Sequence, residues 1–182
     1  RRIYNRLVEL SQQQPYLNAD ETKLRYLSKG HCKTGWIWTL VSKVAIVYMF
    51  SLSRSAKFAE KLLGGTSGKL QIDGYAAYNE VCKKDDVKNE KGRERIGCWA
   101  HCRRGFFKAQ KNYPEAKEML DLILELYKVE YHAAEKGILE TEEHLALRQD
   151  QSAGILIKMK EWLDEKKGHF PPKSAMGKAI TY

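Results

Sequence analysis

The chain has 182 residues, of which 43% are hydrophobic and only four are proline, so collagen-like, mucin-like and wholly disordered proteins are excluded. Its 32 basic residues outnumber 23 acidic ones, which gives a net charge of +9. No apolar run approaches the roughly 20 residues of a membrane span. We therefore expect a soluble intracellular protein with a substantial core.

The positive charge is concentrated in the first part of the chain. Residues 1–110 hold 21 basic and 10 acidic residues, a net charge of +11, whereas residues 111–182 hold 11 basic and 13 acidic residues, a net charge of −2. A basic face on one module is typical of a polyanion partner such as nucleic acid, although it also favours solubility alone. The four cysteines are too few and too irregularly spaced for a disulfide framework.

The hydrophobic pattern predicts an α/β domain up to residue 110. After a helix over 1–13, it predicts strands over 16–27, 35–41, 44–50, 69–73 and 95–99, and helices over 55–63, 75–83 and 101–111. Ser55 is a candidate cap of its helix, and Ser42-Lys43 joins two strands as a hairpin. The order implies a mixed five-stranded sheet with an antiparallel hairpin and helical crossovers.

The hydrophobic pattern of residues 111–182 predicts helices. Pro114 suits the first position of a long helix that Gly137 ends, and Thr141 is a candidate cap of the next. Gly154 inside that helix suggests close packing or a bend. After Pro171-Pro172, Ser174 is a candidate cap of a last helix.

Two acids lie where strands normally carry apolar residues. Asp20 falls in the first strand and Asp73 at the end of the fourth. Alternation places Asp20 on the face opposite to Glu21. If the two strands are neighbours, about 4.8 Å apart, the carboxylates of Asp20 and Asp73 come close enough to share Mg²⁺ or Mn²⁺. The alternative is that Asp20 is a strand-end charge and Asp73 a turn former before Gly74.

Other candidate sites are basic or contain thiols. Arg54, between two serines at a helix start, is a candidate phosphate contact. His101, Arg103, Arg104 and Lys108 follow one another along a short helix, where they either contact successive phosphates or form a solvated face. Cys98, His101 and Cys102, completed by His31-Cys32, give a weak pattern for a zinc site. Trp36 and Trp38 are expected to be core residues.

Taken together, four ordered motifs resemble the transposases of bacterial insertion sequences of family sixty-six. They are Ala19-Asp20-Glu21-Thr22, Ser51-x-Ser53-Arg54-Ser55, Gln71-x-Asp73-Gly74-Tyr75-x-x-Tyr78-Asn79 and Cys98-Trp-Ala-His101-x-Arg103-Arg104-x-Phe106. Two helical segments also match, Leu145 to Gln149 and Pro172 to Ile180. The resemblance covers about residues 4–182.

This resemblance implies a ribonuclease-H-like fold with a DDE-type active site, in which two aspartates and a glutamate bind two Mg²⁺ ions. Asp20 matches the first acid and Asp73 the second. Residues 1–110 would be the first part of the catalytic core, and residues 111–182 a helical insertion with the start of the return segment. The third acid of the family lies downstream of residues 177–180, so we expect this chain to lack it, and the DNA-end-binding region would precede Arg1.

The implied function is metal-dependent cleavage of DNA strands and their transfer into target DNA, with Arg54, His101, Arg103, Arg104 and Lys108 as DNA contacts. The expected partners are the element's DNA ends, target DNA and further copies of the protein, in the bacterial cytoplasm at the nucleoid and not at a membrane. On this interpretation the parent protein is the enzyme, and this fragment alone is inactive. The alternative is a truncated, non-catalytic DNA-binding or assembly module.

Overall fold

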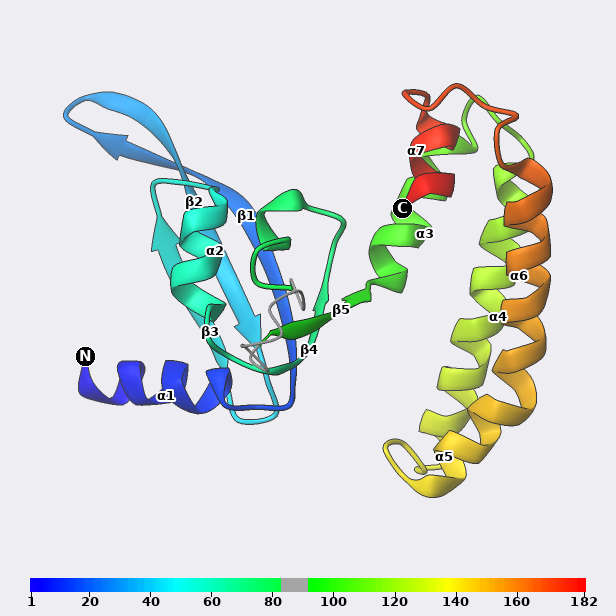
Figure 1. Ribbon diagram of the computed structural model, residues 1–182, viewed down its shortest axis with the longest axis horizontal. Helices are drawn as coiled ribbons and strands as arrows, with labels where there is room; N and C mark the ends of the chain where they lie inside the picture. Colours follow the sequence, from blue (N-terminus) through cyan, green and yellow to red (C-terminus); the bar gives the residue numbers. More distant parts are fainter. Residues whose placement is uncertain (83–91) are drawn as a thin grey trace. The chain divides into compact units, whose positions relative to one another are not determined.

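The computed structural model of the protein describes residues 1–82 and 92–182 (Figure 1). Those residues form two compact units, 1–98 and 99–182, which are described separately below. The sequence pattern placed the corresponding boundary after residue 110. Helix α3 (Trp99–Ala109) nevertheless contributes Phe106 and Ala109 to the core of the second unit, so the structural division falls before this helix.

The first unit is built on a mixed five-stranded sheet, as predicted. Its strands are β1 (Tyr16–Ser28), β2 (His31–Val41), β3 (Ile46–Ser51), β4 (Gly68–Ile72) and β5 (Arg93–Gly97). Their spatial order is β3-β2-β1-β4-β5. The pairs β1–β2 and β2–β3 are antiparallel, whereas β1–β4 and β4–β5 are parallel. The α/β class expected from the sequence is confirmed.

Two hairpins build the antiparallel half of the sheet. The predicted one joins β2 to β3, where Val41 pairs with Ile46. The other joins β1 to β2 through Lys29 (φ 48°) and Gly30 (φ 74°), both in the left-handed region that this type of tight turn requires. Strand β2 begins four residues before its predicted start at Gly35. Its first residues, 31–34, are polar or exposed on both faces, so the hydrophobic pattern did not reveal them.

Helices α1 (Arg2–Gln12) and α2 (Ala56–Leu63) contribute to the core of the first unit, where their apolar side chains meet the inward-facing residues of the strands. The buried members include Leu17, Trp38, Leu40, Leu63, Leu70, Ile72 and Tyr78. Trp36 packs against the same cluster, so both tryptophans are core residues as expected.

The structure differs locally from the predicted elements at a cap, at one helix and at two element starts. Ser55 occupies the N-cap position of α2, but its side chain makes no capping hydrogen bond. The helix expected over 75–83 is only the 3₁₀ turn η1 (Ala76–Tyr78) within the described residues, and most of the charged stretch that follows lies outside them. Strand β5 and helix α3 each begin two residues before their predicted starts at Arg95 and His101.

The second unit consists of helices. After α3 come α4 (Ala116–Glu135), α5 (Glu142–Leu147), the π-helical turn η2 (Arg148–Ser152), α6 (Ala153–Lys166) and α7 (Ala175–Thr181). Figure 1 shows α4 and α6 running side by side, and their facing residues Met119, Ile123, Met159 and Trp162 are buried. Within the described ranges, no helix is long and apolar enough to cross a membrane.

The predicted caps of this unit are confirmed, and two other predictions are not. The Thr141 hydroxyl accepts a hydrogen bond from the His144 N–H, and the Ser174 hydroxyl accepts one from the Gly177 N–H. Helix α4 starts at Ala116 instead of Pro114. A Cβ on Gly154 would meet nothing within 4 Å, so this glycine does not serve close packing, and the irregularity is the preceding π-helical turn.

Candidate functional site

Asp20 and Asp73 occupy equivalent positions on two neighbouring parallel strands. The pairing of β1 with β4 ends with Asn18 opposite Gln71. Asp20 lies two residues beyond Asn18, and Asp73 lies two residues beyond Gln71, directly after the last residue of β4. The sequence interpretation required these two strands to be neighbours, and they are.

The side-chain alternation places both acids on the same face of the sheet. Leu17 and Ala19 on β1, and Leu70 and Ile72 on β4, are buried in the core. The residues between and beyond them therefore face the opposite side, where Tyr16 donates a hydrogen bond to Gln71 Oε1 (2.6 Å). Asp20 is exposed there and Asp73 is half-buried.

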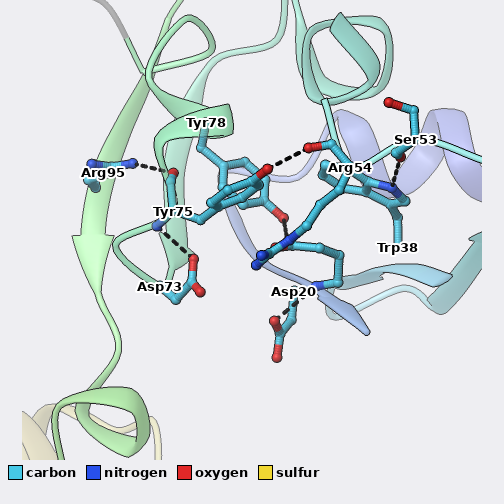
Figure 2. Close-up of polar contacts among 9 residues, drawn as sticks. Asp20, Trp38, Ser53, Arg54, Asp73, Tyr75, Tyr78 and Arg95 are labelled. Carbon is cyan, nitrogen blue, oxygen red and sulfur yellow. Dashed lines mark hydrogen bonds and ion pairs between the residues drawn. The ribbon is translucent and has the colours of Figure 1, made fainter. Parts of the chain in front are cut away.

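Backbone N–H groups orient the two carboxylates. Asp20 Oδ1 accepts a hydrogen bond from the N–H of Glu21 (2.9 Å), and Asp73 Oδ1 accepts one from the N–H of Tyr75 (2.9 Å). The second bond closes a turn of the kind that Asp favours, immediately after the strand. Figure 2 shows the hydrogen bonds that Asp20 and Asp73 accept as dashed lines.

Glu21 is a buried acid next to this pair. Its side chain is inaccessible to solvent, and Oε1 accepts hydrogen bonds from Nε (2.8 Å) and Nη2 (2.5 Å) of Arg54. Oε2 accepts a hydrogen bond from the Tyr78 hydroxyl (2.7 Å). A buried carboxylate requires such partners, because desolvation of an unpaired charge is costly.

Arg54 is fixed by aromatic rings as well as by Glu21. Its guanidinium carbon lies 3.8 Å from the ring centroid of Tyr75 and 5.0 Å from that of Trp36. Tyr75 also donates a hydrogen bond to the Arg54 carbonyl (2.5 Å) (Figure 2). Burial lowers the pKa of Arg54, but the hydrogen bond and charge of Glu21 outweigh burial, so the pKa is raised.

The pKa of the Tyr78 hydroxyl is raised by burial and by the acids around this site. Burial raises the pKa of its hydroxyl most, followed by the hydrogen bond to Glu21 and then by the charges of Glu21, Asp73 and Asp20. The phenol therefore stays protonated and remains a hydrogen-bond donor to Glu21. Nothing in the sequence pattern indicated this role for Tyr78 or Tyr75, whose partners lie far away along the chain.

The other predicted DNA contacts lie on α3, in the second unit. The spacing puts His101, Arg104 and Lys108 on one helix face, away from the buried Phe106 and Ala109. Arg103 lies instead over the ring of Phe107, with 5.8 Å from its guanidinium carbon to the ring centroid. Arg103, Arg104 and Lys108 are exposed, whereas His101 is half-buried.

The thiol-containing pattern does not form a metal site in the described part of the chain. None of the four cysteines, which all lie in the described part of the chain, forms a disulfide, and Cys32 is exposed near the tip of the β1–β2 hairpin. Within residues 1–82 and 92–182, no three His, Cys, Asp or Glu side chains gather in a way that could hold a metal ion. The zinc interpretation is therefore not supported.

The residues present do fit part of a hard-metal site. Asp20 within β1 and Asp73 directly after β4 place carboxylate oxygens on one face of neighbouring strands, and oxygen atoms are the ligands that Mg²⁺ and Mn²⁺ prefer. Glu21 is not available for that purpose, because both of its oxygens are already bonded to Arg54 and Tyr78 on the core side. This half-site contains two acids.

Comparison with known proteins gives a family match over the whole chain. The family model described as "Transposase IS66 family" matches residues 1–182. The chain is 32% identical over 193 aligned residues to the uncharacterized protein y4jD of Sinorhizobium fredii, covering 99% of this chain and 37% of that protein. It is 30% identical over 178 residues to the uncharacterized protein y4qI of the same organism, covering 90% of this chain and 32% of that protein. The chain thus spans about a third of the length of these curated relatives.

Proposed function

The chain belongs to the IS66 transposase family, and from this we propose that it is the central part of a DDE-type DNA transposase whose site includes Asp20 and Asp73. The observation that carries the proposal is the placement of these two acids at equivalent positions on one face of the parallel strands β1 and β4. The strand order β3-β2-β1-β4-β5 is compatible with the ribonuclease-H-like topology that this function requires.

Asp20 and Asp73 would hold a divalent cation, Mg²⁺ or Mn²⁺. When bound, such ions supply positive charge that stabilises the attacking and leaving oxygens of a phosphodiester. The backbone N–H bonds from Glu21 and Tyr75 orient the two carboxylates, which reduces the cost of ordering them around a cation. In the parent protein we expect a third acid from outside residues 1–182 to complete the site for two ions.

Arg54 would bind a DNA phosphate beside the acids. Its guanidinium is held by Glu21 and by the Tyr75 ring, and its side chain retains 34% of its exposure, so it stays accessible to a ligand. An arginine that is already positioned loses little conformational entropy when it contacts a phosphate oxygen. Glu21 and Tyr78 are positioning residues in this proposal, because they act through Arg54.

The basic residues of α3 would bind the DNA backbone. Arg103, Arg104, Lys108 and His101 occupy an 11-residue helix, and the three cations are exposed. Residues 111–182 would serve as a helical insertion in a catalytic core that begins in residues 1–110. The expected setting is a bacterial cytoplasmic complex at the nucleoid that contains several copies of the protein.

A metal titration tests the proposal. We expect Mn²⁺ to bind the 182-residue chain, and the relaxation rate of water protons measures this binding. Binding should be lost in both Asp20→Asn and Asp73→Asn. Glu94→Gln, which removes an exposed carboxylate from β5, is the matched control and should bind Mn²⁺ like the unmodified chain. Equal Mn²⁺ binding in all four proteins, or none in the unmodified chain, would contradict the proposed site and favour the alternative of a non-catalytic DNA-binding or assembly module.

A further inference from the structure

Helix α4 carries a line of exposed apolar side chains. Leu124 and Tyr131 are 51% and 66% exposed, and Tyr127 between them is also exposed. Together with the half-buried Leu120, they recur at intervals of four, three and four residues, which places all four on one face of the helix. We call Leu120, Leu124, Tyr127 and Tyr131 the α4 stripe.

Three members of the α4 stripe, Leu124, Tyr127 and Tyr131, are exposed outside the contact between α4 and α6, whereas Leu120 packs against the edge of that core. That contact uses Met119 and Ile123, which are buried against Met159 and Trp162 of α6. Single exposed apolar residues are common on protein surfaces, but a line of large ones over three helical turns is typical of an interaction surface. The intervals of the stripe are also those of the apolar seam in a pair of packed helices.

We propose that the α4 stripe is the contact surface for a second copy of this chain, with the two α4 helices packed antiparallel about a two-fold axis. In such an arrangement the same surface is used by both copies and must be complementary to itself. An axis passing near Glu125 and Leu126 places Leu124 opposite Tyr127 of the second copy, and Leu120 opposite Tyr131 of the second copy. Every apolar member of the stripe then faces another.

The charged residues beside the stripe support the same arrangement. The axis that pairs the apolar residues brings Asp121 of one copy next to Lys128 of the other, and the Lys117 end of one helix next to the Glu135 end of the other. Both pairs join opposite charges, and each occurs twice because of the symmetry. In a parallel arrangement the flank that carries these four residues would instead face the opposite flank of the second helix, where Met119 and Ile123 are buried against α6, so the opposite charges would not meet. Charge complementarity therefore selects the antiparallel pair.

The proposed function includes an assembly of several copies, and the α4 stripe would be the surface through which two copies bind. Its test measures only the mass of the particle, so its failure would leave the metal and DNA proposals standing, and their failure would leave the dimer standing. The 20-residue helix α4 is about 30 Å long, which is sufficient for a seam of four apolar layers.

Sedimentation velocity over a concentration series of the 182-residue chain tests the apolar part of the contact. We expect a dimer whose dissociation constant rises by at least about tenfold in the double variant Leu124→Ser/Tyr131→Ser. Ile157→Ser is the matched control, because Ile157 is 59% exposed on α6 and lies outside the stripe, so its dimer should be unchanged. Far-ultraviolet circular dichroism verifies that each variant is folded.

A charge swap tests the antiparallel register. Lys128→Glu places two acids together and should weaken the dimer by about tenfold. The double variant Asp121→Lys/Lys128→Glu recreates opposite charges across the two-fold axis and should restore it. A monomeric chain at all concentrations, a dimer insensitive to the stripe variants, or a double swap that fails to restore the dimer would each overturn the proposal.

Discussion

The buried carboxylate of Glu21 receives two hydrogen bonds from the guanidinium of Arg54, which is 33 residues away in the sequence. The pair joins the core-facing side of β1 to the segment before α2. Arg54 reaches this position because Tyr75 and Trp36 flank its guanidinium. Through this pair Glu21, whose two oxygens are both hydrogen-bonded, fixes the position of the Arg54 guanidinium.

We predict that Glu21→Gln destabilises the first unit. The substitution leaves the guanidinium of Arg54 without its counter-charge and turns an amide N–H₂ toward a donor, either Arg54 or Tyr78. Because Arg54 is partly solvated, we expect a loss of about 1–3 kcal/mol in the free energy of unfolding, less than for a fully buried pair. Urea denaturation followed by tryptophan fluorescence measures it. Glu94→Gln is the control, and an equal effect of both variants would show that the Glu21–Arg54 pair contributes nothing.

A second prediction concerns Arg93, whose residue exposure is 0%. Its Nη2 donates to the carbonyl of Gln12 (2.7 Å) and its Nε to the hydroxyl of Thr66 (2.8 Å), and further bonds reach Gln14 and Lys69. Arg93 thus connects the segment after α1 with the start of β4. Burial lowers the pKa of its guanidinium, although the side chain keeps its charge.

Arg93→Met removes all of these donors and leaves buried carbonyls unsatisfied, so we expect a loss of about 2–4 kcal/mol in the free energy of unfolding. Arg93→Lys should lose less, because an ammonium retains three donors without the planar geometry. Arg95→Met is the control, since Arg95 is exposed and donates a hydrogen bond to the Tyr75 carbonyl at the surface. Urea denaturation of the four proteins would contradict this account if Arg93→Met were no less stable than Arg95→Met.

Much of the first unit could be predicted from periodicity. Alternating apolar residues located all five strands, and Asp20 within the first strand and Asp73 after the fourth stood out because aspartate is rare in strands. The first residues of β2 were missed because residues 31–34 are exposed on both faces, so the hydrophobic pattern has no period there. The β1–β2 turn pairs glycine with Lys29, a residue rarely found at positive φ.

The interactions that position the site could not be predicted, because they join distant segments. Alternation correctly put Glu21 on the face opposite to Asp20, but nothing local indicated that its partners would be Arg54 and Tyr78. Arg93 ends the charged segment 84–93, whose composition is that of an exposed loop, whereas the structure buries it against four backbone or hydroxyl oxygens. A single sequence contains the residue types of such contacts but not their pairing in space.

A pH prediction follows from Glu130 in the second unit. Its carboxylate accepts bonds from Nε (2.7 Å) and Nη2 (2.6 Å) of Arg148, and His144 Nε2 lies 3.2 Å away. The hydrogen bond from Arg148 lowers the pKa of Glu130 against an opposing effect of burial, and the charges of Arg148 and His144 lower it further. The contact ties α4 to α5 and η2 at one end of the helical unit.

Because the pKa of Glu130 is lower in the folded state, its contribution is fully present above the unfolded pKa of about 4.3 and is lost as the pH falls through the folded value. We expect the melting temperature of the chain to fall between pH 5 and pH 3. The melting temperature of Glu130→Gln should fall less steeply, because the uptake of about one proton on unfolding is removed. Glu94→Gln, which removes an exposed carboxylate from β5, serves as the control. Identical pH profiles for Glu130→Gln and the unmodified chain would refute this role.

The last prediction concerns the basic residues of α3 and the salt dependence of DNA binding. If Arg104 and Lys108, which share a helix face, each neutralise one phosphate, replacing either by alanine should reduce the slope of log Kd against log salt concentration by about one. Arg103→Ala should have a smaller effect, because Arg103 lies over Phe107 instead of on that face.

Fluorescence anisotropy with a random-sequence duplex at several salt concentrations measures these slopes, and Lys158→Ala, which removes an exposed lysine from α6, is the control. The loss should be uniform across DNA sequences, since phosphate contacts do not distinguish bases. If the slope were unchanged in Arg104→Ala and Lys108→Ala but reduced in Lys158→Ala, the DNA contact would lie on α6 instead of α3. The positive charge of residues 1–110 would then act only on solubility, which is the alternative that charge alone leaves open.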